Sequence, residues 1–425
     1  MLAAPFDVLG FPKPTSPQHF ISHLIMTTSK LYILLLLSVL TFTAKAQSRY
    51  TKQSLLSTGR WVKIRVPEEG VYQLTPTTLK SMGFSDPSSV RLYGYNLPFL
   101  PEQCIENLDD DLTELPLYRR DNGTLLFYSC GTTRWTKVNT SRGESFTHRN
   151  NPYSTHIYYF LTEGNGTPAA FQSTVATTNN NNPQTTYLTH SLHEEDAYSF
   201  LNTGRTFFEQ YDYANGNTKT YKLNLDNTSC GDILLDISFG AAGSSPSTLT
   251  VSTDNNNIGT LSFSALQDYI YASVTNKTFT LYDRTVSSAS FTLKHTRSAG
   301  ISGHLDYLRL SYPANLSLTG KNYVVFSPNT DNTAAISVDG ADSHTSVWNI
   351  TTPTATHALQ GTLSGTSYKI GISTPSIHDR YIAVKTNAVF PTPENIGVIT
   401  NQNLHALDLS LIHISEPTRL LSISY

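Results

Sequence analysis

The sequence predicts an all-β protein made of consecutive β-rich domains, including a jelly-roll-like antiparallel sandwich, with few short helices. Charged residues make up only 14% of the 425 residues, against about 25% in typical soluble domains. Tyr (24 residues) and Phe (19 residues) are abundant, and aromatic side chains suit half-buried pleated surfaces. Between residues 221 and 313, short apolar runs recur at intervals of roughly eight to twelve residues, which is typical of a β-sandwich.

The first elements follow from alternation and capping. Residues 61–66 (WVKIRV) alternate apolar and basic side chains, which predicts a strand with one buried face. Residues 69–74 supply a turn, Glu-Gly, and a second apolar run, so we predict a hairpin. Thr75 can cap a short helix that starts at Pro76 and ends at Gly83.

Later strands are predicted from apolar runs bounded by turn residues. They cover residues 90–93, 125–128, 157–161, 221–225, 233–237, 249–252, 291–293, 308–312, 323–326, 335–338, 347–350 and 381–384. We expect a long polar loop over residues 136–155, turns at 240–243 and 255–257, and an exposed Thr/Asn-rich linker at 177–183.

The predicted domains are an N-terminal β-rich domain (47–185), the jelly-roll-like sandwich (186–315) and a small β domain (316–400).

A secretory signal over residues 26–46 is the sharpest local feature. Lys30 precedes the apolar run 31–42, which is too short to span a bilayer comfortably. The small residues of Ala44-Lys45-Ala46 allow cleavage between Ala46 and Gln47. We therefore expect a protein exported through a Sec-type signal, with a mature chain that starts at Gln47.

The two ends of the chain differ in character from the rest. We expect residues 1–25 to be an upstream mis-start, because Met26 begins the signal well; a disordered extension is the alternative. Residues 409–425 (LSLIHISEPTRLLSISY) resemble the conceptual translation of a sequencing-library adapter, so they are excluded from fold reasoning. The natural chain is then expected to continue past Asp408; the alternative is a genuine C-terminal strand.

Cysteine chemistry is weakly indicated. Cys104, Cys130 and Cys230 match neither a disulfide framework nor a zinc spacing; one bridge is left open, and unpaired packed cysteines are the alternative. Cys230 is a candidate nucleophile, but we favour a packed strand-edge cysteine. His148 and His304 are candidate bases without a recognisable partner in the sequence.

Metal and phosphate chemistry is weaker still. Asp109, Asp110 and Asp111 are weak candidates for calcium; their spacing is not that of an EF-hand, and turn or cap residues are the favoured alternative. The string His-Glu-Glu-Asp at 193–196 lacks the second His of a metalloprotease helix. Gly-rich phosphate loops are absent from the sequence, and the net charge of -3 indicates no nucleic-acid partner. We expect no cofactor besides that weak calcium candidate.

An ordered set of stretches resembles a known family. The stretches are residues 57–64, 69–74, 90–94, 100–102, 110–114, 126–128, 134–135, 146–148, 151–154, 158–162, 201–205, 304–308 and 347–351. From about residue 53 to residue 407 they resemble the N-terminal region of the type IX secretion system sortases, which are gingipain-like cysteine peptidases.

The resemblance implies a surface-held cysteine endopeptidase and transpeptidase at the outer membrane. Such a protein removes C-terminal signals from secreted cargo, joins the cargo to anionic lipopolysaccharide and works with an outer-membrane β-barrel partner. The family's catalytic His and Cys lie in a gingipain-like domain, whose start the resemblance places at residues 401–408. No position here matches that motif, so no catalytic residue is assigned; neither Cys230 nor His405 takes the role.

Two alternatives use the sandwich itself. One is a non-catalytic glycan-binding module in which Trp135, Trp348 and tyrosines stack on sugar rings. The other is an inert adhesin-like surface domain.

Overall fold

The computed structural model describes residues 51–101, 109–164, 166–175, 182–202, 204–254, 256–329, 335–372 and 375–407. The chain divides into two units, Met1–Lys52 and Gln53–Tyr425, and only the second is treated below. The predicted signal, its cleavage point at Ala46 and Gln47, Cys104, most of the 177–183 linker and the 409–425 tail lie outside the described residues.

The strands of the first half are β1 (Trp61–Val66), β2 (Glu69–Leu74), β3 (Val90–Tyr93), β4 (Glu114–Leu115), β5 (Tyr118–Arg119), β6 (Leu125–Cys130), β7 (Thr133–Thr140), β8 (Gly143–Asn150), β9 (Ile157–Glu163), β10 (Ser173–Val175), β11 (Thr186–Glu194) and β12 (Thr218–Asn224). The later ones are β13 (Gly231–Ala242), β14 (Ser247–Thr253), β15 (Asn256–Phe263), β16 (Ser273–Arg284), β17 (Ser288–Thr296), β18 (Ser302–Asn315), β19 (Tyr323–Phe326), β20 (Ala335–Val338), β21 (Thr345–Asn349), β22 (His357–Gln360), β23 (Thr362–Ser364), β24 (Ser367–Gly371), β25 (Tyr381–Lys385) and β26 (Glu394–Ile399).

Helices are few, as predicted. The structure has one α-helix within its described residues, α2 (Pro76–Ser81), and short 3₁₀ turns η1 (Leu55–Ser57), η2 (Pro87–Ser89), η3 (Phe200–Asn202), η4 (Pro353–Ala355) and η5 (Leu404–Ala406). The predicted capping of α2 is confirmed: Thr75 Oγ1 accepts from the backbone N–H of Thr78 at 3.1 Å, and Gly83 follows the helix with φ +86°. None of the helices in the described part of the chain is long and apolar enough to cross a membrane.

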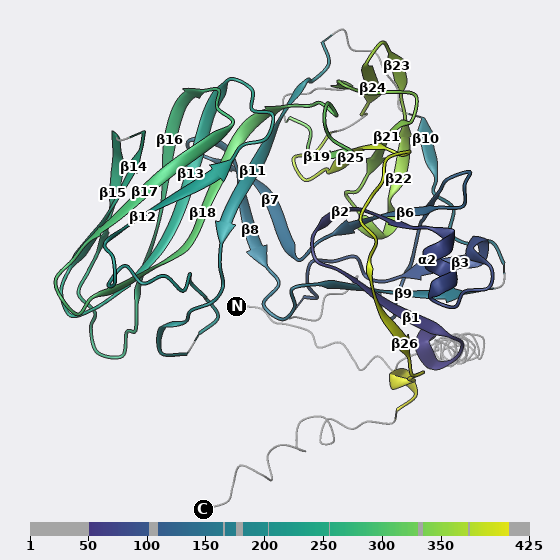
Figure 1. The fold of residues 1–425 in the computed structure, drawn as a ribbon, viewed down its shortest axis with the longest axis horizontal. Coiled ribbons are helices and arrows are strands. Elements are labelled where there is room, and N and C mark those ends of the chain that lie inside the picture. Colours follow the sequence, from purple (N-terminus) through teal and green to yellow (C-terminus); the bar gives the residue numbers. More distant parts are fainter. Residues whose placement is uncertain are drawn as a thin grey trace, which may run out of the picture. The chain divides into compact units, whose positions relative to one another are not determined.

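Strands β11–β18 form the predicted jelly roll. One sheet has the order β11-β18-β13-β16 and the other β12-β17-β14-β15, which is the strand order of a jelly roll. Phe239 of β13 and Phe291 of β17 are fully buried in the shared core, with Leu249 of β14 among their companions. Figure 1 shows this sandwich in teal and green, carried by long antiparallel strands. The all-β prediction is therefore confirmed.

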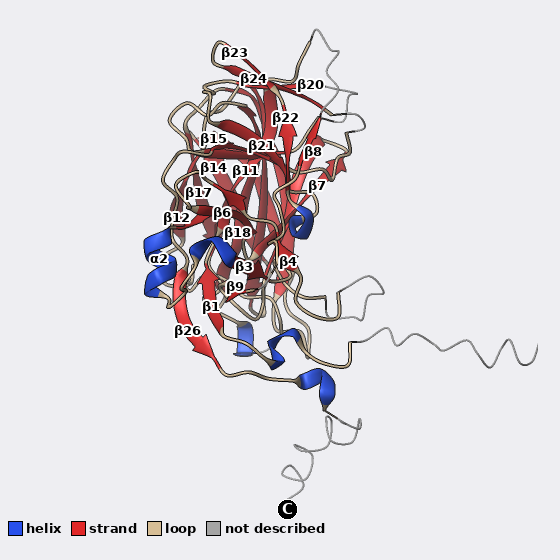
Figure 2. Cartoon of the chain, turned by 90° about the vertical axis from the view of Figure 1, so that its right-hand side faces the viewer, coloured by secondary structure: helices blue, strands red, loops and turns tan. Residues whose placement is uncertain are grey.

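The remaining strands join segments that are far apart in the sequence. One five-stranded sheet has the order β26-β1-β9-β3-β4, and Figure 2 shows β26 beside β1. In this pair, Trp61 of β1 lies opposite Ile399 of β26. Another has the order β10-β22-β21-β25-β19, in which β10 runs parallel to β22. Smaller sheets have the orders β2-β6-β5, β20-β24-β23 and β7-β8. The segments 47–185 and 316–400 thus share two sheets.

The predicted hairpin over residues 61–74 is wrong. β1 pairs with β9 and β26, whereas β2 pairs with β6 in another sheet. Ile64 of β1 and Leu74 of β2 are both fully buried in one cluster, so the two strands pack face to face. The alternation of apolar and polar residues is the same in two strands that pair in one sheet and in two strands that pack face to face. It therefore could not show which arrangement β1 and β2 adopt.

The predicted loop over residues 136–155 is also wrong. β7 and β8 form a regular antiparallel hairpin, with Thr133 opposite Asn150 and Thr140 opposite Gly143. The turn is closed by the backbone N–H of Arg142, which donates to Thr140 Oγ1 at 3.1 Å. Polar residues occupy both faces of this hairpin because it packs on polar groups, described below.

The predicted turn at 240–243 lies mostly within β13, which continues to Ala242. A Cβ added at Gly240 would approach the Phe208 and Phe200 rings to 2.8 and 2.9 Å. Gly240 therefore marks a close approach of two rings to the strand.

Candidate functional site

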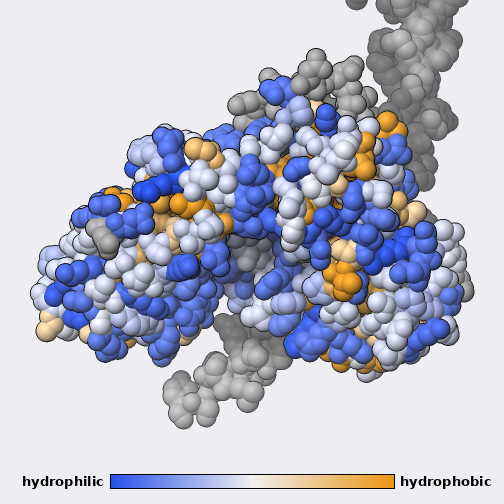
Figure 3. Space-filling model, turned by 45° about the horizontal axis from the view of Figure 1, so that its top comes forward, coloured by the Kyte–Doolittle hydropathy of each residue, from blue (hydrophilic) through white to orange (hydrophobic). Residues whose placement is uncertain are grey.

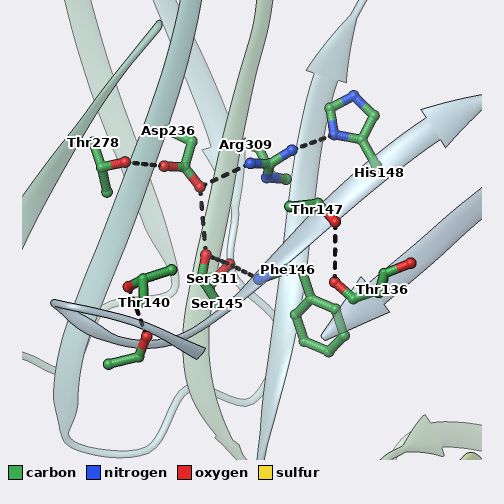
Figure 4. A network of polar contacts seen from close by, with 11 residues as sticks. Thr136, Thr140, Ser145, Phe146, Thr147, His148, Asp236, Thr278, Arg309 and Ser311 are labelled. Carbon is green, nitrogen blue, oxygen red and sulfur yellow. Dashed lines mark hydrogen bonds and ion pairs between the residues drawn. The ribbon is translucent and has the colours of Figure 1, made fainter. Parts of the chain in front are cut away.

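A buried polar network fixes the β7–β8 hairpin to the jelly roll (Figure 4). Arg309 of β18 and Asp236 of β13 form an ion pair at 3.0 Å, with side chains only 8% and 13% exposed. Thr278 of β16 donates to the same carboxylate. On the hairpin side, the backbone N–H of Phe146 donates to Ser311 Oγ at 3.0 Å. The hairpin is thus attached through directional polar contacts, which set its position on the sheet.

His148 of β8 completes this network. Its Nδ1 lies 2.7 Å from Arg309 Nη1, and its Nε2 lies 3.0 Å from Glu194 Oε2. A guanidinium only donates, so Nδ1 accepts and the Nε2–H donates to Glu194. Both ring nitrogens are therefore engaged, and His148 positions Glu194 instead of acting as the free base considered from the sequence.

Beside His148 lies an open cleft of about 760 Å³. Glu194 and Asp196 of the acidic string face it, together with Asp306 of β18. Burial raises the pKa of Asp306 to about 6; Glu194 and Asp196 add to the rise, and the Ser238 hydroxyl opposes it by donating at 2.7 Å. The cleft therefore gathers three carboxylates, one of which, Asp306, has a pKa raised by burial to about 6.

His193 points away from this cleft, as alternation along a strand requires. Its Nε2 lies 3.7 Å from the Glu209 carboxylate, beyond hydrogen-bond distance, and Glu209 accepts hydrogen bonds from Lys219 and Tyr221. Burial alone would raise the pKa of Glu209, but these three partners outweigh it and hold the pKa at about 2. Glu209 was not singled out from the sequence, because its partners come from separate segments.

His304 is a packed core histidine. Its Nδ1 lies 3.0 Å from the Glu209 carbonyl oxygen, and its ring stacks on Tyr198 with centroids 3.8 Å apart.

The two described cysteines are both free but differ in exposure. Cys130 is buried at the end of β6, and burial strongly raises the pKa of its thiol, which disfavours the nucleophilic thiolate. Cys230 is exposed just before β13, so the favoured interpretation of a packed cysteine is wrong there. The strand pattern begins one residue later, at Gly231, and leaves the thiol outside the core.

The acidic triplet does not converge on one point. Asp109 accepts from Thr113 Oγ1 at 2.6 Å, Asp110 lies 3.5 Å from His405 Nδ1, and Asp111 accepts from the backbone N–H of Leu55. Across the described ranges, no group of three His, Cys, Asp or Glu side chains is arranged to hold a metal ion. Calcium at this triplet stays a prediction.

The tryptophans considered for sugar stacking are occupied. Trp348 is fully buried, and Trp135 stacks on His190 with ring centroids 3.5 Å apart. Exposed rings lie elsewhere: Tyr153 is 73% exposed and Phe207 40%, and both line the cleft beside His148. On the face drawn in Figure 3, hydrophobic residues form small groups among hydrophilic ones.

Comparison with known proteins supports the fold. No protein-family model matches the chain, and no curated protein matches it either. Among solved structures, the chain is similar to dimeric latent PorU from Porphyromonas gingivalis, with 24% identity and a TM-score of 0.76 over 86% of this chain and 35% of that chain. The chain therefore has a PorU-like fold and spans about a third of the length of that protein.

Two other matches are too distant to carry an argument. The CBM36-1 domain of a multidomain xylanase from the hindgut metagenome of Trinervitermes trinervoides has a TM-score of 0.20 and 10% identity, over 29% of this chain and 95% of that chain. The insecticidal delta-endotoxin Cry8Ea1 from Bacillus thuringiensis has a TM-score of 0.21 and 7% identity, over 54% of this chain and 42% of that chain.

Proposed function

We propose that this chain is the non-catalytic β-rich front region of a PorU-like sortase, a cysteine peptidase of the type IX secretion system. The region would position a downstream gingipain-like domain that processes the C-terminal signals of cargo. The observation that carries the proposal is the PorU-like fold along most of the chain. The ordered sequence resemblance of residues 53–407 supports it independently.

The cysteine environments agree with a nucleophile located elsewhere in the parent protein. A catalytic thiol needs a lowered pKa and a neighbouring base. Cys130 has the opposite environment, because burial raises its pKa. Within the described residues, neither Cys130 nor Cys230 is hydrogen-bonded to a histidine.

The proposal extends to location and partners. The signal over residues 26–46 supports export, and the family resemblance supports a place on the cell surface at the outer membrane. An outer-membrane β-barrel protein and secreted cargo are the proposed partners, and anionic lipopolysaccharide is the proposed acceptor for the parent enzyme.

Sequencing the source gene beyond the codon for Asp408 tests this proposal. We expect an open reading frame that encodes an α/β domain with a paired His and Cys. An open reading frame without such a domain would contradict the peptidase assignment. Where the domain is present, replacing its Cys by Ala in the source bacterium should leave secreted cargo with uncleaved C-terminal signals. Unchanged cargo processing would contradict the assigned activity.

A further inference from the structure

Two hollows adjoin beside the β7–β8 hairpin. The larger, of about 760 Å³, and its neighbour, of about 600 Å³, share Asn151, Tyr153 and Arg205 as lining residues. Each volume falls within the range of roughly 300–1,000 Å³ that is typical of ligand sites. The shared residues place the two hollows next to each other, with Tyr153 in the wall of both, and together they are called the groove below.

Tyr153 is held as a platform in this groove. Asn151 Oδ1 accepts from the backbone N–H groups of Tyr153 at 2.8 Å and Ser154 at 3.1 Å. The Asn151 amide is itself fixed, since it donates to the Pro98 carbonyl at 2.8 Å. The backbone is therefore pinned by its neighbours while the ring stays 73% exposed. An uncovered ring on a fixed turn is suited to stacking on a flat, partly apolar ligand.

The far end of the groove is prearranged by the polar network. Glu194 accepts from His148 and from Asn150 Nδ2, at 3.0 and 2.6 Å. Its carboxylate orientation is thus set before any ligand arrives. Because these acceptors are already fixed, little side-chain entropy is lost when a ligand binds to them.

The charge balance of the larger hollow indicates the ligand class. Its lining includes the carboxylates Glu194, Asp196 and Asp306 and the guanidinium groups of Arg65, Arg149 and Arg205. Arg65 is paired with Glu394 outside the hollow, and the other charges of the lining are of both signs, so the lining favours neither an anion nor a cation. Planar carboxylates and guanidinium groups do offer paired acceptors and donors, which match the adjacent hydroxyls of a sugar ring.

We propose that this groove binds a neutral oligosaccharide, with a sugar ring stacked on Tyr153 and its hydroxyls bound by the carboxylates at Glu194 and Asp196. The site goes beyond the function proposed above and does not rest on it. It keeps the tyrosine stacking considered from the sequence but not the two tryptophans named there, because both are occupied.

Calorimetric titration of the full chain tests the proposal. The probes are maltohexaose, cellohexaose, xylohexaose and mannohexaose, with an unstructured peptide of mixed sequence as the competing ligand class. We expect at least one hexasaccharide to bind with a Kd below about 1 mM. Tyr153→Ala should weaken that binding by about tenfold, which is the effect of losing one stacked ring.

Matched variants separate the site from general effects. Tyr282→Ala removes a ring of similar exposure, 71% against 73%, from β16 outside the groove and should change the Kd by less than about twofold. Asp196→Ala removes one proposed acceptor and should weaken binding severalfold. Thermal unfolding of each variant checks that the fold is kept. The proposal is overturned if no hexasaccharide binds, if only the peptide binds, or if Tyr153→Ala binds like the unmodified chain.

Discussion

Replacing Arg309 by Met removes the cation from a buried ion pair of the polar network. Among donors from the described residues, the Asp236 carboxylate, 13% exposed, would keep only the hydroxyls of Thr278 and Ser145. Removing one partner of a buried pair typically costs about 3–5 kcal/mol, because the other charge stays uncompensated. His148 Nδ1 also loses its donor. We therefore expect Arg309→Met to lower the free energy of unfolding by about 3–5 kcal/mol.

Urea unfolding followed by tryptophan fluorescence measures this loss. Trp135 is a local reporter, since its ring centroid lies 5.4 Å from that of His148. Arg284→Met is the matched control in the same sandwich: its ion pair with Asp254 is 3.4 Å long, with side chains 41% and 64% exposed. Exposed pairs contribute at most about 1 kcal/mol.

A second substitution tests the cause of the loss. Asp236→Asn in the Arg309→Met background removes the stranded charge while keeping an acceptor for Thr278. The double variant should therefore be more stable than Arg309→Met alone, by about 1 kcal/mol or more. Equal losses for Arg309→Met and Arg284→Met, or no recovery in the double variant, would refute the buried-charge argument.

Three further outcomes are expected. Asp306 has a folded pKa of about 6 against 3.8 in the unfolded chain, so its contribution to stability is full below pH 3.8 and is lost as pH rises through about 6. Asp306→Asn should therefore match the unmodified chain at about pH 3 and be more stable than it at neutral pH in urea unfolding, and equal stabilities at neutral pH would contradict this. Glu209 has a folded pKa of about 2 against 4.5 in the unfolded chain, so its ionised form stabilises the fold above pH 4.5, and this contribution is lost as pH falls towards 2. Glu209→Gln should therefore lower the free energy of unfolding at neutral pH and reduce its dependence on acid pH. A pH profile parallel to that of the unmodified chain would count against the assigned partners. Maleimide labelling with peptide mapping should modify Cys230 in the folded chain and Cys130 only in denaturant, and early labelling of Cys130 would show that β6 opens locally.

The jelly roll was predictable because its strands carry a strong local signal. Leu249 and Val251 of β14 point into the core, while the intervening Thr250 does not, and this alternation is visible in the sequence. β16 was missed because Phe279 and Leu281 are its only buried residues among twelve. A strand at the edge of a sheet needs little apolar surface, so its pattern is faint.

Strand partners were not predictable from alternation. β1 carries a clear pattern, yet it pairs with β26, where Arg65 lies opposite Glu394. Their side chains also form an ion pair at 2.8 Å. Many strands of the chain carry opposite charges, so such a pair does not identify which of two strands far apart in the sequence are neighbours. Hairpin formation was the simplest interpretation, and face-to-face packing of β1 and β2 overruled it.

The same reasoning explains why the groove was not found from the sequence. Its wall depends on the β7–β8 hairpin, whose residues look like a wet loop because Lys137 and Ser145 occupy buried positions. One local signal was present: Lys137 lies opposite Phe146, so Glu144 is its diagonal neighbour across the turn, and the two form an ion pair at 2.7 Å. That pair predicts a hairpin but not what the hairpin packs against. The decisive partners, Asp236 and Arg309, lie far along the chain on two jelly-roll strands. A polar surface can be buried only where donors and acceptors from other parts of the chain form hydrogen bonds with it, and the fold determines which of them lie there.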